Sequence, residues 1–142
     1  MSDAVPVRGI LVAHGSMATG LADAAQRITG IGEEALVPVS NTGIGPDVLA
    51  ARVRAARGPG PTIIFTDMPS GSCGFAARLL ARDDADLAVV CGVNLPMLLD
   101  FLTHRELRLA ELVPRLVSRG RAAIMSAPAG FEGHADPAAS RG

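Results

Sequence analysis

The sequence has 142 residues, of which 49% are hydrophobic and 19% are charged, with a formal net charge of -1. This length and apolar content fit one globular domain with a sizeable core. The charges are spread along the chain and Trp and Tyr are absent, which argues against nucleic acid or an anionic membrane surface as the main partner.

The cysteines and the apolar stretches predict where the protein works. Cys73 and Cys91 do not form a CxxC pair, and the first residues lack the charged-then-apolar pattern of a secretion signal. We therefore expect a reducing, cytoplasmic location. The longest apolar stretch, residues 87–93, is much shorter than the roughly 20 residues that cross a bilayer. Any work at a membrane would then go through a partner.

Four short runs rich in Val, Ile and Leu predict strands that are buried on both faces. They occupy residues 9–13, 35–39, 62–66 and 87–93, and Gly, Pro, Asn or Asp bounds each run. Segments with helical spacing lie between them. This alternation predicts an α/β fold: a doubly wound, mainly parallel sheet of order 2-1-3-4 with helices on both faces.

Helix signals follow each of these strands. The first helix is expected to start after Ser16, a candidate N-cap, and to stop near Gly30. The second is expected from Pro46 to Gly58, and the third from residue 74 to 82. Asn94 is expected to cap a fourth helix that has Pro96 in its first turn.

The last part of the chain is less regular. Apolar residues at 109, 112, 113, 116 and 117 have helical spacing, and Pro114 among them should kink or delay the helix. The segment RAAIM, residues 121–125, is expected to form a short fifth strand. Residues 1–126 are expected to form the domain, and residues 127–142, which have turn-forming composition without periodicity, a mobile tail.

The stretch ILVAHGSMATG places His14 at the carboxyl end of the first strand. Asp67 ends the third strand, in IIFTDMPSGS. With the order 2-1-3-4 these strands are neighbours, and the order reverses between them, where doubly wound sheets bind ligands. We therefore expect His14 and Asp67 to face each other. An aspartate on one ring nitrogen fixes the tautomer and leaves the other nitrogen free as nucleophile or base.

The loop Ser70-Gly71-Ser72, just before the third helix, is predicted to bind a phosphoryl group or another anion. Gly15 contributes backbone at the same edge, and Asn94 is expected to line the site. Each feature has a simpler interpretation, because a histidine at a strand end is often a turn residue and SGS is a common flexible turn. Together they predict a histidine that accepts a phosphoryl group, without a metal or another cofactor.

Three segments resemble one family, enzyme IIA of the mannose-type branch of the bacterial phosphoenolpyruvate-dependent sugar phosphotransferase system. ILVAHGSMATGLADAA is similar to its phosphohistidine segment, IIFTDMPSGSCGFAARLL to its aspartate loop, and VVCGVNLPMLLDFL to its Gly-Val-Asn-Leu-Pro-Met element. The segments occur in order at similar spacing, and the similarity extends over about residues 7–126. The last of the three is the most specific.

The resemblance implies that His14 takes a phosphoryl group from the carrier protein HPr through its ring nitrogen Nε2. It then passes the group to a IIB domain, which phosphorylates sugar arriving through membrane IIC and IID subunits. Asp67 would orient and polarise His14, and Ser72 would help to hold the phosphoryl group. A homodimer that exchanges its last strand is also implied, so residues 121–125 would pair with a partner chain.

The aspartate loop departs from the family pattern Asp-x-x-Gly-Gly-Ser-Pro-x-Asn. Ser70, Cys73 and Phe75 stand where the first glycine, the proline and the asparagine are usual. Asp67 and Ser72 keep the expected residue types. Phosphoryl acceptance is therefore expected, whereas the IIB partner and the sugar are left open, as is a purely regulatory relay.

Two other classes of function are compatible with a strand followed by His-Gly-Ser. One is a small cobalt or iron chelatase of tetrapyrrole synthesis, in which the histidine binds metal. Those enzymes usually have an arginine directly after the motif, where this chain has Met17, and a second histidine at a strand end, where neither His104 nor His134 lies. The other is a non-catalytic module that binds a small anion at the same edge.

Overall fold

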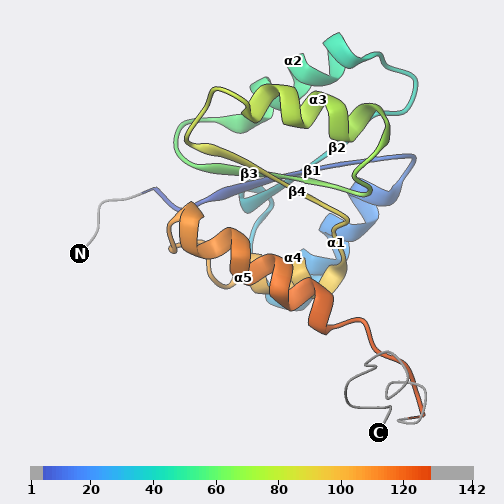
Figure 1. The fold of residues 1–142 in the computed structure, drawn as a ribbon, viewed down its shortest axis with the longest axis vertical. Coiled ribbons are helices and arrows are strands. Elements are labelled where there is room, and N and C mark those ends of the chain that lie inside the picture. Colours follow the sequence, from blue (N-terminus) through green and yellow to red (C-terminus); the bar gives the residue numbers. More distant parts are fainter. Residues whose placement is uncertain (1–4, 129–142) are drawn as a thin grey trace, which may run out of the picture.

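A computed structural model describes residues 5–128, which form a four-stranded parallel sheet with helices on both faces (Figure 1). The strands are β1 (Arg8–Ala13), β2 (Leu36–Ser40), β3 (Thr62–Thr66) and β4 (Leu87–Cys91). The helices are α1 (Met17–Thr29), α2 (Pro46–Arg57), α3 (Gly71–Ala81), α4 (Leu95–Leu102) and α5 (Leu109–Ala122), with a 3-10 turn at Glu33–Ala35. The strand order is β2-β1-β3-β4. The predicted fold class and strand order are confirmed.

The sheet is covered on both faces, so its strands are apolar on both sides. Helices α2 and α3 lie on one face, and α1, α4 and α5 lie on the other (Figure 1). In β1, Ile10 and Val12 belong to the core under α2 and α3, whereas Leu11 belongs to the core under the other three helices. Phe65 and Phe101 meet edge to face in that second core, with ring centres 5.1 Å apart.

Gly9 in β1 lies against the ring of Phe101. A Cβ at this position would be 2.7 Å from Phe101 Cε2 and 2.9 Å from Leu36 Cδ1. We expect Gly9→Ala to lower the free energy of unfolding by about 1–3 kcal/mol, the usual cost of overpacking a core. Urea denaturation measures the change.

Gly20→Ala is the matched control. Gly20 lies within α1, where an added Cβ would have no atom within 4 Å. Because alanine favours a helix over glycine, this change should raise the free energy of unfolding by up to about 1 kcal/mol. Equal effects of the two substitutions would contradict the packing assigned to Gly9.

The helix ends agree with the sequence signals except at α3. Gly30 caps the end of α1, with a φ of 75° and its N–H donated to the carbonyl of Gln26. α2 begins with Pro46 and is capped by Gly58, and Asn94 caps the start of α4, as predicted. α3 begins at Gly71 rather than at residue 74, because Gly71 adopts a φ of 88° and directs the chain into the helix directly after the extended Ser70.

Residues 121–122, expected to begin a fifth strand, instead belong to α5, which continues through Ala122, and residues 123–125 form no strand in the single chain. The helix passes through Pro114, which lies on its exposed side. Gly120 holds the last turn against α4: a Cβ there would be 2.7 Å from Met97 Cε, and the carbonyl of Gly120 accepts a bond from the Asn94 side chain. Most of the expected mobile tail, residues 129–142, lies outside the described residues.

Candidate functional site

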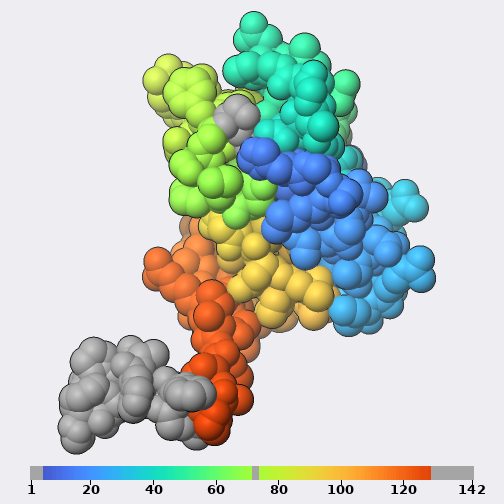
Figure 2. Space-filling view, turned by 90° about the vertical axis from the view of Figure 1, so that its right-hand side faces the viewer, coloured from blue at the N-terminus to red at the C-terminus, as the bar shows by residue number. Residues whose placement is uncertain are grey.

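Three neighbouring strands end together at one edge of the sheet. β1 lies between β2 and β3, with Ala13 paired to Ser40 and Val12 paired to Thr66. The residues that follow these strands therefore meet at the same level. Figure 2 faces this edge: the start of α1, in blue, reaches the surface between the green segment of α3 and the teal segment of α2.

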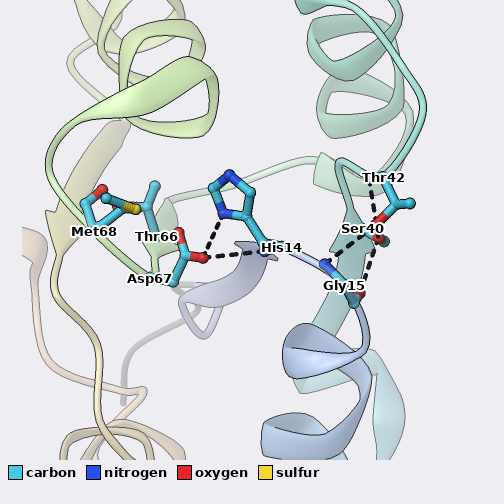
Figure 3. Close-up of polar contacts among 7 residues, drawn as sticks. All are labelled: His14, Gly15, Ser40, Thr42, Thr66, Asp67 and Met68. Atoms are coloured by element: carbon cyan, nitrogen blue, oxygen red, sulfur yellow. Dashed lines mark hydrogen bonds and ion pairs between the residues drawn. The ribbon is translucent and has the colours of Figure 1, made fainter.

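His14 and Asp67 are in direct contact, as the topology predicts. Asp67 Oδ2 lies 2.7 Å from His14 Nδ1, and the same oxygen accepts the backbone N–H of His14 at 3.0 Å. The His14 side chain is 52% exposed, whereas that of Asp67 is only 9% exposed. In Figure 3 the second ring nitrogen points away from Asp67 and out of the sheet edge. The carboxylate therefore fixes one side of the ring and leaves the other accessible.

The second oxygen of Asp67, Oδ1, is buried and has no hydrogen-bond partner among the described residues. Oδ2 makes both bonds to His14, so that residue orients the carboxylate. A buried carboxylate oxygen without a donor is costly. The two N–H groups of His14 offset part of this cost, so the two residues form one unit.

The pKa of Asp67 lies below its ordinary value of 3.8. Burial acts to raise this pKa, but the hydrogen bonds from the His14 ring and backbone and the charge of the His14 ring together lower it. A depressed folded-state pKa contributes stability that is fully present above the unfolded-state pKa. That stability is lost as the pH falls through the folded-state pKa.

We therefore expect a pH-dependent difference in stability between the wild type and Asp67→Asn. The difference in free energy of unfolding should shrink as the pH falls below about 4, because the wild-type carboxylate becomes protonated. Urea denaturation of both proteins between pH 3 and pH 5 tests this. A difference that grows on acidification would contradict the assigned contact.

Gly15, expected to offer its backbone to a phosphoryl group, is already bonded to β2 and to the loop after it. Its N–H donates to Thr42 Oγ1 at 3.1 Å, and its carbonyl accepts the Ser40 hydroxyl at 3.1 Å (Figure 3). The two hydroxyl oxygens lie 3.0 Å apart. Sequence reasoning did not identify Ser40 and Thr42. The signal was present, because Ser-Asn-Thr, residues 40–42, stands where the second strand ends, and the predicted order places that strand beside the first.

Ser70 and Gly71 lie at the start of α3, near the same edge. Ser70 is exposed and occupies the N-cap position without a side-chain capping bond. The side chain of Ser72 lies outside what the structure describes. The loop before the helix is held by Thr66 Oγ1, which donates to the Met68 carbonyl, and by Arg78, which donates to the Pro69 carbonyl.

Asn94, expected to cap a helix and to line the site, uses its side chain to stabilise two helices. Its Oδ1 accepts the Met97 N–H at 3.1 Å, and its Nδ2 donates to the Gly120 carbonyl at 2.9 Å. Both halves of the amide are thus used between α4 and α5. Its position after β4 was predicted, but its side-chain partner on α5 has no local sequence signal.

We expect Asn94→Ala to destabilise the fold without slowing the chemistry. Loss of a cap costs about 1–2 kcal/mol in free energy of unfolding, and the Gly120 carbonyl also loses its donor. Urea denaturation should show this loss, while phosphoryl acceptance by the folded variant should match the wild type. A rate defect larger than the stability defect explains would restore Asn94 to the site.

Among the described residues, no three His, Cys, Asp or Glu side chains gather closely enough to hold a metal ion. Within residues 5–128, no helix is long and apolar enough to cross a membrane.

A family model and several solved structures are similar to this chain. A family model described as PTS system fructose IIA component (EIIA-man) matches residues 9–116. A phosphotransferase system component EIIA from Streptococcus agalactiae is similar in structure, with a TM-score of 0.78 and 21% identity over 84% of this chain and 96% of that chain. The mannose/sorbose specific IIA subunit from Enterococcus faecalis has a TM-score of 0.72 and 27% identity over 87% and 96% of the two chains.

A PTS IIA protein associated with the fucose utilization operon of Streptococcus pneumoniae is also similar, with a TM-score of 0.71 and 14% identity over 87% of this chain and 94% of that one. The search of curated proteins gave no match. The family model covers well over half of the sequence, from β1 into α5, and includes both His14 and Asp67. The chelatase and the non-catalytic module are therefore not favoured. The chain belongs to the mannose-type IIA family of the sugar phosphotransferase system and is a phosphoryl-carrier component of that system.

Proposed function

We propose that His14 carries the phosphoryl group on Nε2 and that Asp67 keeps the ring proton on Nδ1. The observation that carries this proposal is the 2.7 Å contact between Asp67 Oδ2 and His14 Nδ1, made by a buried carboxylate on a half-exposed ring. A proton on Nδ1 leaves the lone pair on Nε2. The nucleophilic nitrogen is then the one that a partner protein can reach.

The proposed transfer needs no covalent change in the protein beyond this nitrogen. The Nε2 lone pair attacks the phosphorus of a donor phosphohistidine, a new N–P bond forms, and the N–P bond of the donor breaks. The donor imidazole keeps the electrons of that bond. The His14 ring becomes cationic with its proton still on Nδ1, and the Asp67 carboxylate stabilises that charge. Alignment and charge stabilisation account for most of such a reaction.

The partners follow from the family. We propose that the donor is HPr and the acceptor is a IIB domain, in the cytoplasm, with membrane IIC and IID subunits served only through IIB. The proposed binding groups for the phosphoryl oxygens are the N–H groups at the start of α3 and the hydroxyls of Ser70 and Ser72, because helix N-termini favour anions. Gly15 is left out of this set, since Thr42 accepts its N–H.

The test is reconstitution with purified enzyme I, HPr and phosphoenolpyruvate. The expected product carries one acid-labile, base-stable phosphoryl group per chain, located by mass spectrometry on the peptide that contains His14. Adding a IIB domain should then discharge it. A phosphoryl group on another residue, or none while HPr itself is phosphorylated, would contradict the proposal.

We also propose that the protein is a homodimer, as its family implies. Ile124 and Met125, which follow α5, are 77% and 75% exposed in the single chain. Large apolar side chains exposed side by side are typical of an interface. Sedimentation of the full chain should give a dimer mass, and the variant Ile124→Glu/Met125→Glu should sediment as a monomer. A monomeric wild type at micromolar concentration would contradict this assignment.

A further inference from the structure

The backbone of His14 and Gly15 is held from both neighbouring strands. On the β3 side, Asp67 Oδ2 accepts the His14 N–H. On the β2 side, Thr42 Oγ1 accepts the Gly15 N–H, and Ser40 Oγ donates to the Gly15 carbonyl. Figure 3 shows the two sets of bonds on opposite sides of the segment that carries the imidazole.

The hydroxyls of Ser40 and Thr42, the hydroxyl pair, form a connected set with the backbone. The Thr42 N–H donates to Ser40 Oγ at 3.2 Å, which fixes the Ser40 oxygen beside the chain. Ser40 has one proton, which serves either the Gly15 carbonyl or Thr42 Oγ1. Thr42 Oγ1 accepts the Gly15 N–H in either case. The peptide group before Gly15 is therefore anchored to Thr42 in either case, and the peptide group after Gly15 is anchored when the Ser40 proton is on its carbonyl.

No side-chain packing holds Gly15, so its position depends on hydrogen bonds. Gly15 is exposed and has a φ of 58°, and an added Cβ would have no atom within 4 Å. A glycine in such a position has wide conformational freedom unless its peptide groups are bonded. One bond joins the segment to α1, between the Met17 N–H and the His14 carbonyl at 3.2 Å. Another joins the Asn41 N–H to the Ala13 carbonyl at 3.3 Å, and the hydroxyl pair adds the restraint on Gly15 itself.

We propose that Ser40 and Thr42 are positioning residues for His14. By anchoring Gly15 they fix the backbone from which the imidazole projects, and so keep Nδ1 on Asp67 and Nε2 directed outward. This inference rests on the proposed role of His14 as phosphoryl acceptor. It adds that the accurate placement of the ring depends on β2 as well as on β3.

Because Ser40 and Thr42 lie near the surface, an experiment can distinguish a positioning role of their hydroxyls from a structural role. Thr42 is exposed and Ser40 is only partly buried, and hydrogen bonds at such positions add little net stability because water replaces them. Reaction rates are more sensitive, because small misplacements of a reacting group cost large factors. Loss of the Thr42 hydroxyl should therefore slow transfer while the melting temperature stays close to that of the wild type.

The test uses phosphoramidate, a small phosphoryl donor, so that partner docking does not enter the rate. Thr42→Val is expected to slow phosphorylation of His14 about tenfold, and Thr42→Ser, which keeps the hydroxyl, to react at nearly the wild-type rate. The ring ¹⁵N signals of His14 in Thr42→Val should move toward averaged values for the two nitrogens. Thr103→Val is the matched control, because Thr103 is also exposed and its hydroxyl bonds the end of α4.

Ser40→Ala is the second variant, with the same expected direction, in case Thr42→Val does not fold. Equal rates for Thr42→Val and the wild type, or an equal defect in Thr42→Ser, would overturn the inference while leaving the role of His14 intact. A wild-type protein that phosphoramidate and phospho-HPr both fail to phosphorylate at His14 would instead overturn the proposed function.

Discussion

His14→Gln is expected to abolish phosphoryl acceptance, to less than about 1% of the wild-type rate, because the side-chain amide has no nucleophilic nitrogen lone pair. The variant should fold, since the ring it removes is half exposed. Stopped-flow or quench measurement of transfer from phospho-HPr gives the rate, and circular dichroism checks the fold.

His104→Gln is the matched control for that variant. The His104 ring is also paired with an aspartate, because its Nδ1 lies 3.3 Å from Asp100 Oδ1. It lies at the opposite edge of the sheet, since the neighbouring Arg105 bonds the Val7 backbone just before β1. We expect full activity. Retained acceptance in His14→Gln, or its loss in His104→Gln, would show that the phosphoryl group goes elsewhere.

Asp67→Asn is expected to slow both acceptance and donation, on the order of 100-fold, by changing the ring tautomer. If the amide NH2 of asparagine faces the ring, Nδ1 must accept and the proton moves to Nε2, which can then no longer attack. In this variant the cationic His14 ring that forms on transfer also lacks the carboxylate that would stabilise its charge. Rates in both directions, measured with HPr and with a IIB domain, test this. Unchanged rates would contradict the paired site.

Asp84→Asn is the control for the loss of a paired aspartate. Asp84 pairs with Arg57, and its loop lies beside the start of β3, where the Thr62 N–H bonds the Asp86 carbonyl. This contact is remote from the carboxyl ends of the strands. The substitution should leave transfer rates unchanged, so any general effect of removing an aspartate ion pair can be separated from the loss at Asp67.

The fold could be predicted because each buried strand is a continuous apolar run followed by a helix. A strand that helices cover on both faces leaves a strong sequence signal, as at residues 62–66, where every residue of β3 is buried. The contact between His14 and Asp67 followed from topology alone, since neighbouring parallel strands bring their carboxyl ends together. No spacing in the sequence shows that pair.

The remaining site features depend on tertiary contacts that leave no local pattern. Asn94 has the same sequence signal whether it lines a site or binds α5, and only the fold places Gly120 beside it. Residues 121–122, expected in a strand, continue α5, and only the fold places the last turn of that helix, at Gly120, against Met97. The hydroxyls of Ser40 and Thr42 become meaningful only once β2 is placed beside β1.

The most direct test of the paired site is the state of the His14 ring nitrogens, read by ¹H–¹⁵N NMR before and after phosphorylation by phospho-HPr. The free protein should show the proton on Nδ1 and an unprotonated Nε2, and the phosphorylated protein should show the N–P bond at Nε2 with Nδ1 still protonated. A proton on Nε2 in the free protein, or a phosphoryl group on Nδ1, would contradict the account.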